Sequence, residues 1–279
     1  MHAADPNRKA GGHSSGAYGP PNGRRQLQSV DICGTPLALT DYERALDWMD
    51  ATVAARHKAY VCVAAVHTVM LAREDKELRA AVLDADMVVP DGQPLVWAMN
   101  ALGHELDARV YGPDLMRKAF ERASKTGTSM FIYGCNDRAM LDAFVDKLKA
   151  DYPGIKIAGS YSPRFRPLSI AEQQEVALAI NDAAPDIVWC GLGVPRQEKW
   201  MATMRGRLDA PVLIGVGAAF DFLGGRVAEA PPWVQKRGLE WAYRLTREPK
   251  RLFWRYVKYN PLFVITFGAQ YLRGRLSRS

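Results

Sequence analysis

Short segments with continuous apolar runs recur along this chain and alternate with longer segments of helical pattern. They are YVCVAAV (residues 60–66), DMVVPD (86–91), SMFIYG (129–134), DIVWCGLG (186–193) and PVLIGVG (211–217). A strand with one solvated face alternates apolar and polar residues, whereas continuous apolar runs are typical of parallel strands covered by helices on both faces. The sequence therefore predicts an α/β protein with a Rossmann-like, largely parallel sheet flanked by helices.

The remaining segments complete a core expected at residues 26–230. A strand or hairpin is predicted at 30–39, followed by a helix that begins after Thr40 and Asp41 and has apolar residues at helical spacing. Further helices are predicted at 68–83, 92–102, 113–124, 137–152, 170–183 and 197–208, with one more strand at 156–161. Ligands of such sheets bind beyond the carboxyl ends of the strands, so the candidate site residues are sought there.

The two ends of the chain differ from this core. Residues 1–25 are rich in Gly, Pro, Ser and basic residues and lack the apolar stretch of a signal peptide, so we expect a disordered tail and a cytoplasmic protein. Residues 231–279 interleave Trp, Tyr and Phe with Lys and Arg. This pattern predicts a helical, basic appendage that docks on an anionic membrane surface, or alternatively packs onto the core. The apolar stretch 261–272 is too short to cross a bilayer, which predicts a peripheral protein on the inner face of the cell membrane.

Composition narrows the class of partner. The formal net charge of +7 indicates an anionic one: nucleic acid, a phosphorylated substrate or anionic lipid. The four cysteines lie far apart and form no CxxC pair, so they are expected to be buried, reduced thiols rather than zinc ligands. The Asp84-Ala85-Asp86 triplet resembles the DxD of metal-dependent transferases, but it precedes a strand instead of following one. We therefore expect it to end a helix, and we expect no metal site.

Two strand-end loops carry the strongest chemical signal. Asp91 directly follows a buried strand and Gly92 forms the turn into a helix, so Asp91 is either a general base at the cleft or a helix cap. The second loop is GLGVPRQEKW, in which Gly191, Gly193 and Pro195 precede a helix start that favours a phosphate group. Its first turn contains Gln197 and Glu198, both predicted to face the cleft.

A third loop and one arginine give weaker signals. The loop IYGCND places Tyr133, Gly134 and Asn136 between a strand and a helix, where Asn136 is a possible helix cap or a substrate contact. Arg109 precedes another helix start, where an arginine is often only solvated. His67 shows no metal-ligand spacing and is expected to be a satisfied loop histidine near the cleft.

Together these segments resemble the WecG/TagA/CpsF family (glycosyltransferase family 26) over residues 30–260. The resemblance rests on ADMVVPDGQPLVW, RVYGPDLM, DIVWCGLGVPRQEKWM, IGVGAAFDFLGG and APPWVQKRGLEWAYRLTREPKRLFWRY, in this order. It implies an inverting, metal-independent transferase without a cofactor. Such an enzyme moves a sugar from a UDP-sugar to a polyprenyl-pyrophosphate-linked saccharide of cell-envelope or exopolysaccharide biosynthesis.

The resemblance also implies roles for particular residues. Asp91 matches the family's proposed base, Gln197 its cleft glutamine and Arg109 an arginine near the active site. The spaced arginines of the appendage, expected to fold over the diphosphate, match Arg237, Arg244 and Arg247. Relatives further suggest a homo-oligomer.

One position departs from the family. Where relatives carry a Thr-Pro-Asn segment, this chain has Val63 and Ala65, which leaves the donor open among an N-acetylmannosamine-type sugar, a hexose and a uronic acid.

Three rival functions are less well supported. A dinucleotide-dependent oxidoreductase would require GxGxxG after a strand, which is absent from the sequence. Nucleic-acid binding by the basic end is compatible with its aromatics, but no recognised module accompanies it, so we expect no nucleic-acid partner. A non-catalytic UDP-sugar-binding scaffold of a polysaccharide assembly complex remains the alternative to the enzyme.

Overall fold

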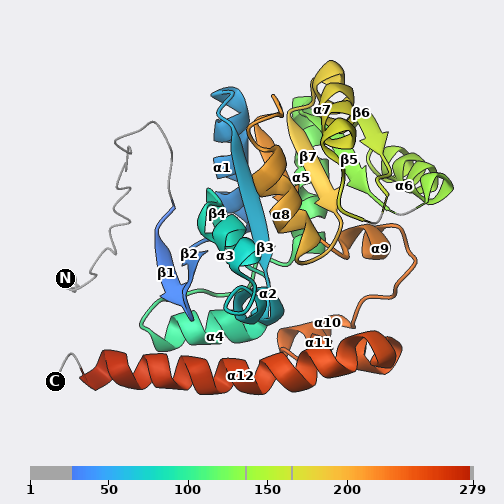
Figure 1. Ribbon diagram of the computed structural model, residues 1–279. Helices are drawn as coiled ribbons and strands as arrows, with labels where there is room; N and C mark the ends of the chain where they lie inside the picture. The colour runs from blue at the N-terminus through green and yellow to red at the C-terminus, as the bar shows by residue number, and fades with distance from the viewer. Residues whose placement is uncertain (1–26, 136, 165, 277–279) are drawn as a thin grey trace, which may run out of the picture.

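A six-stranded, all-parallel sheet forms the centre of the computed structural model, which describes residues 27–135, 137–164 and 166–276 (Figure 1). The strand order is β4-β3-β8-β7-β5-β6. In chain order the strands are β3 (Ala59–Ala64), β4 (Met87–Pro90), β5 (Ser129–Gly134), β6 (Lys156–Tyr161), β7 (Ile187–Gly191) and β8 (Val212–Gly215). The predicted α/β, Rossmann-like class is confirmed.

Helices cover both faces of the sheet, which explains the continuous apolar runs. On one face, Tyr60 and Cys62 of β3 join a core cluster with α2 (Val66–Leu71), α3 (Lys76–Leu83), α4 (Gln93–Ala101), α7 (Ile170–Ala183) and α8 (Arg196–Met204). On the other face, Val61 and Val63 join a cluster with α1 (Tyr42–Ala54), α5 (Gly112–Thr126), α6 (Arg138–Asp151) and α9 (Ala219–Leu223). Alternate residues of one strand therefore face two separate cores, so every position must be apolar.

Local signals set several boundaries. Asp41 caps α1 by accepting a hydrogen bond from the Arg44 amide at 2.9 Å, and β1 (Ser29–Ile32) pairs antiparallel with β2 (Thr35–Ala38) as the predicted hairpin. The single helix predicted at 68–83 is wrong. The chain turns after Leu71, and Asp75 starts a second helix by accepting from the Leu78 amide at 3.0 Å.

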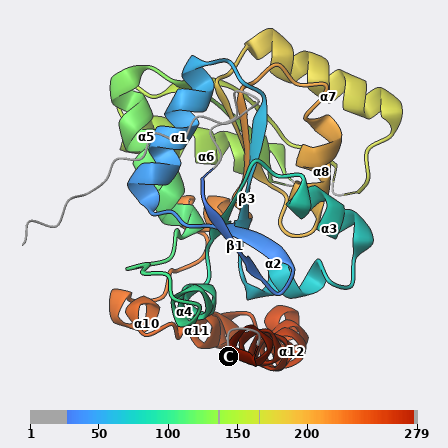
Figure 2. The ribbon, with the colours of Figure 1, turned by 90° about the vertical axis from the view of Figure 1, so that its left-hand side faces the viewer.

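The C-terminal segment is helical, as predicted, and lies along one end of the core. It comprises α10 (Pro232–Lys236), α11 (Glu240–Arg247) and the long α12 (Pro249–Leu276), which runs beneath α2 and α4 in Figures 1 and 2. The far end of α12 is fixed to the hairpin, because the Gln270 side chain accepts from the Cys33 amide at 2.8 Å and donates to the Asp31 carbonyl at 2.7 Å. In the described part of the chain, no helix combines the length and hydropathy needed to cross a membrane. The predicted tail, residues 1–25, lies outside the described residues.

Candidate functional site

A cavity of about 580 Å³ lies at the carboxyl ends of β3 and β4, where α11 and α12 cover the core. Asp91 and Gly92 line it from the β4–α4 turn, and Ala65 lines it from the end of β3. The other charged groups that line it are Arg109, Glu240, Arg244 and Arg255. The cavity therefore joins the predicted strand-end site to the C-terminal appendage.

Asp91 is held in place by both its backbone and its side chain. Its amide donates to the Ala64 carbonyl of β3 at 2.8 Å, and its Oδ1 accepts from the Gly112 amide at 2.9 Å. Gly112 is the first residue of α5, so the carboxylate meets a helix N-terminus, where negative charge is favoured. Asp91 does not cap α4, since Gly92 occupies that position. One carboxylate oxygen thus remains outside this hydrogen bond.

The surroundings of Asp91 favour proton uptake. Burial raises the pKa of this carboxyl above its ordinary value, and the neighbouring Glu240 adds to the rise. The charges of Arg109 and Arg244 and the Gly112 hydrogen bond oppose it. A carboxylate with a raised pKa is a stronger proton acceptor, which is the property a general base requires.

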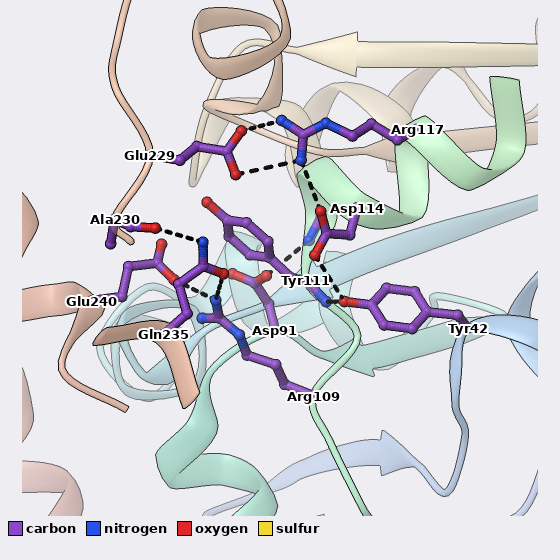
Figure 3. A network of polar contacts seen from close by, with 11 residues as sticks. Tyr42, Asp91, Arg109, Tyr111, Asp114, Arg117, Glu229, Ala230, Gln235 and Glu240 are labelled. Carbon is purple, nitrogen blue, oxygen red and sulfur yellow. Dashed lines mark hydrogen bonds and ion pairs between the residues drawn. The ribbon is translucent and has the colours of Figure 1, made fainter. Parts of the chain in front are cut away.

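Arg109 joins the core to the appendage (Figure 3). Its guanidinium forms an ion pair with Glu240, at the start of α11, and donates to Gln235 Oε1 at 3.2 Å. Only 13% of the Arg109 side chain and 9% of the Glu240 side chain are exposed. Burial opposes the charge on Arg109, but the carboxylates of Asp91 and Glu240 raise its pKa. Arg109 is thus a buried, charged residue and not the solvated arginine that its sequence context alone would indicate.

A second ionic contact holds the segment that leads into the appendage. Arg117 of α5 forms an ion pair with Glu229 and donates to Asp114 Oδ1 at 2.7 Å (Figure 3). Beside it, Gln235 donates to the Ala230 carbonyl at 2.8 Å. Contacts of Arg109 and Arg117 with Glu229, Gln235 and Glu240 therefore fix residues 229–240 over the end of the sheet.

Arg244 and His67 both line the cavity, and each has a buried nitrogen without a hydrogen-bond partner among the described residues. Arg244 Nε has no partner among the described residues, and its guanidinium carbon lies 5.3 Å from the centroid of the Phe222 ring. His67 Nδ1 is equally unpartnered, and the ring meets Tyr259 edge to face at 5.1 Å. Burial, with the nearby Arg255 charge, lowers the pKa of His67 to about 3, so this imidazole is neutral. His67 lies near the cleft, as the sequence predicted, but the expectation of a satisfied loop histidine is wrong, because His67 belongs to α2 and its Nδ1 has no partner in the described part of the chain.

Gln197 and Glu198 are buried rather than open to the cavity, with 1% and 0% of their surfaces exposed. Gln197 Oε1 accepts from the Gly193 amide at 3.1 Å and the Gly217 amide at 2.8 Å, so it ties together the loops after β7 and β8. Its amide group donates to Glu198 Oε1 at 2.9 Å. Burial raises the pKa of Glu198 to about 7.

Close packing against Phe220 explains the glycines at the ends of β5 and β7. A Cβ atom on Gly191 would lie 2.5 Å from the Phe220 ring, and one on Gly134 would lie 2.8 Å from it. Gly193 differs, because its φ of +75° favours glycine and no atom lies within 4 Å of its Cβ position. Gly193 thus leaves open space just before α8, while its amide donates to Gln197 Oε1.

Other predicted contacts lie apart from Asp91. Tyr133 is fully buried, stacked on Trp200 at a centroid distance of 4.1 Å, and together with Pro195 lines a second cavity of about 550 Å³ beside α8. Arg237 and Arg247 are exposed and do not line the first cavity. Asn136 lies outside the described residues.

The Asp84–Asp86 triplet lies where the sequence predicted, at the opposite end of β4. Asp84 ends α3, and Asp86 Oδ2 accepts from the Tyr60 amide at 3.0 Å. These carboxylates support the starts of strands and do not reach the cavity at their carboxyl ends.

A carboxylate of raised pKa beside partly buried arginines is suited to group transfer in which one oxygen loses a proton and an anion departs.

Comparison with known proteins identifies the family. The model of the glycosyl transferase WecG/TagA/CpsF family matches residues 30–277. This chain belongs to that family and is a glycosyltransferase.

Two curated relatives are each similar over 193 residues, 69% of this chain and 72% of the relative. The protein of Bacillus spizizenii is 33% identical and that of Bacillus subtilis 32% identical. Both are named N-acetylglucosaminyldiphosphoundecaprenol N-acetyl-beta-D-mannosaminyltransferase.

Proposed function

We propose that this enzyme moves a sugar from a UDP-sugar to a saccharide carried on a polyprenyl diphosphate, for cell-envelope or exopolysaccharide synthesis. The observation that carries the proposal is the placement of Asp91, with a raised pKa, in a cavity that is also lined by partly buried arginines from the core and the appendage. The names of the two Bacillus relatives support the acceptor class. The donor is an N-acetylmannosamine-type sugar, a hexose or a uronic acid.

In the proposed reaction Asp91 is the general base. It takes the proton of the acceptor hydroxyl while that oxygen attacks the anomeric carbon from the side opposite the diphosphate. The bond to the UDP oxygen breaks, so the configuration at the anomeric carbon inverts. The Gly112 hydrogen bond orients the carboxylate through Oδ1, and the charge of Arg109 stabilises its ionised form.

The leaving diphosphate requires positive charge, which in this proposal comes from the protein and not from a metal ion. Arg244 is best placed, since its Nε is buried in the cavity wall without a partner. A guanidinium pairs bidentately with phosphate oxygens and stabilises charge where it develops. Arg237 and Arg247 lie outside the cavity and would reach the diphosphate only after a local movement of α10 and α11.

Ala65 is one reason why the donor sugar is not determined at this position. It lines the cavity at the end of β3 with a methyl group only, where relatives have a polar residue in the Thr-Pro-Asn segment, and Val63 is buried against Gly112. Fewer polar contacts to the sugar are available at this strand end. The neutral ring of His67, in the first turn of α2, is a hydrogen-bonding group of the same cavity that could contact the sugar instead.

Exchange of Asp91 for Asn tests the base directly. Asp91→Asn keeps an oxygen that accepts from Gly112, so the fold and UDP binding are expected to persist while turnover falls by about 10²–10⁴-fold. Turnover is measured as UDP release and UDP affinity by calorimetry, with Asp84→Asn as the control at the opposite end of the sheet. Turnover retained in Asp91→Asn would disprove the base, and UDP binding without turnover in the native enzyme would favour the scaffold.

A further inference from the structure

The cavity above Asp91 continues beyond its charged groups as an apolar groove between α4 and α12. Its α12 side consists of residues at offsets of 0, 4, 7, 8, 11 and 12 along the helix, which lie on one helical face: Tyr256, Asn260, Phe263, Val264, Phe267 and Gly268. Its α4 side consists of Pro94, Trp97 and Ala98. None of these residues has a part in the proposed chemistry at Asp91.

The groove has a direction. Helix α4 starts next to Asp91 and runs away from it above α12 (Figure 1), so the lining changes from charged to apolar along both helices. Between Tyr256 and Gly268 the helix rises by about 18 Å at 1.5 Å per residue. The cavity therefore offers a charged end for an anionic head and an extended apolar wall for a chain attached to it.

The apolar lining is left without a cover in the described structure. Trp97 is 53% exposed and Val264 is 68% exposed, although both are large apolar residues on the groove. At Gly268, which lines the cavity, a Cβ atom would meet nothing within 4 Å, so there is open space beside α12 at this position. Exposed apolar surface of this kind, continuous with a charged site, marks a ligand-binding groove.

We propose that this groove binds the first isoprene units of the acceptor's polyprenyl chain while the diphosphate lies at the arginine end. The inference rests on the proposed function, which supplies an acceptor with a diphosphate and a long apolar chain. It adds that the enzyme recognises the lipid itself. Phe263 at the base of the groove is only 5% exposed, so a chain in contact with it lies inside the protein surface and not merely in the bilayer.

A leucine at Gly268 tests the groove by filling it. Gly268→Leu adds a side chain into open space, and the matched control Gly274→Leu adds the same side chain on the same helix outside the cavity. The probes are farnesyl diphosphate and inorganic diphosphate, with affinities measured by calorimetry. We expect Gly268→Leu to weaken farnesyl diphosphate binding by about tenfold, the loss of contact with one or two methylene groups, and to leave inorganic diphosphate unchanged. Gly274→Leu should change neither.

A second variant and a vesicle-binding measurement distinguish binding of the polyprenyl chain in the groove from contact of α12 with a membrane. Val264→Ser alters an exposed residue of the groove and is also expected to weaken farnesyl diphosphate binding, with the same thermal unfolding midpoint as the native protein. Equal farnesyl diphosphate affinity in all variants would contradict the proposal that the groove binds the polyprenyl chain. A loss of vesicle binding in Gly268→Leu without a loss of farnesyl diphosphate affinity would contradict it too. Because these measurements need no glycosyl transfer, failure of the proposed reaction with every donor would be seen separately, in UDP release.

Discussion

At the scale of the residue, the burial of Asp91 predicts how turnover depends on pH. A base must be ionised, so turnover is lost as the pH falls through the pKa of this carboxyl, which burial raises above its ordinary value. We expect kcat/KM to rise with pH to a plateau, with the acidic midpoint above the ordinary aspartate range. The profile is measured by UDP release. A midpoint at or below that range would contradict the assigned role.

Glu198 makes a second prediction, about stability. Its folded-state pKa is raised from 4.5 to about 7, so the stability associated with its protonated form is complete below pH 4.5 and is lost as the pH rises through 7. We expect the free energy of unfolding of the native protein to fall over this range by on the order of 3 kcal/mol relative to Glu198→Gln. Urea unfolding between pH 5 and 8 measures it. Parallel curves for the two proteins would show that Glu198 titrates normally.

Residue placement was only partly predictable. The position of Asp91 followed from a buried strand that ends in a carboxylate, since the carboxyl ends of parallel strands share one edge. The burial of Gln197 and the stacking of Tyr133 did not follow, because they depend on partners distant in sequence, the loop at Gly217 for Gln197 and Trp200 of α8 for Tyr133. Only the structure shows that Arg109 pairs with Glu240, 131 residues later.

At the scale of the element, the ion pair between Arg109 and Glu240 decides whether α11 stays over the cavity. Breaking a buried pair leaves one charge uncompensated, at about 3–5 kcal/mol, whereas an exposed pair contributes about 0–1 kcal/mol. We expect Glu240→Gln to speed amide exchange in residues 232–247 and to lower turnover at least tenfold. Hydrogen exchange detected by mass spectrometry measures the first effect.

The matched control is Glu77→Gln, which removes an 83% exposed carboxylate paired with Lys199. It should alter neither exchange nor turnover. Unchanged exchange in Glu240→Gln would mean that α11 is held by its other contacts alone.

Elements themselves were predicted well where the pattern was continuous. The apolar runs located the strands of the parallel sheet, and the helical appendage followed from its aromatic and basic residues. The break between α2 and α3 was not predicted, because the apolar spacing of this segment is compatible with one helix. In the structure Asp75 caps the start of a second helix within it.

At the scale of the whole molecule, the outer side of α12 makes a prediction about membranes. Trp254, Ile265 and Leu272 are each more than half exposed, and cations lie along the same helix. We expect Ile265→Ser to lower partitioning onto anionic vesicles by about tenfold, because an apolar side chain no longer enters the interface. Vesicle sedimentation measures the effect, and added salt should weaken binding further.

The control is Leu178→Ser, which alters a 64% exposed leucine on α7, at the end of the molecule away from α12 in Figure 1. It should leave vesicle binding unchanged. Equal losses in both variants would contradict a docking surface on α12.

The central claim, transfer from a UDP-sugar to a polyprenyl-diphosphate acceptor by a protein-supplied base and cations, is tested most directly by UDP release. Purified enzyme is given a panel of UDP-sugars with a farnesyl-diphosphate-linked N-acetylglucosamine, with and without EDTA. We predict release with one donor, dependent on the acceptor and unaffected by EDTA. Release abolished by EDTA and restored by a divalent ion would contradict the metal-independent mechanism, and no release with any donor would contradict the claim as a whole.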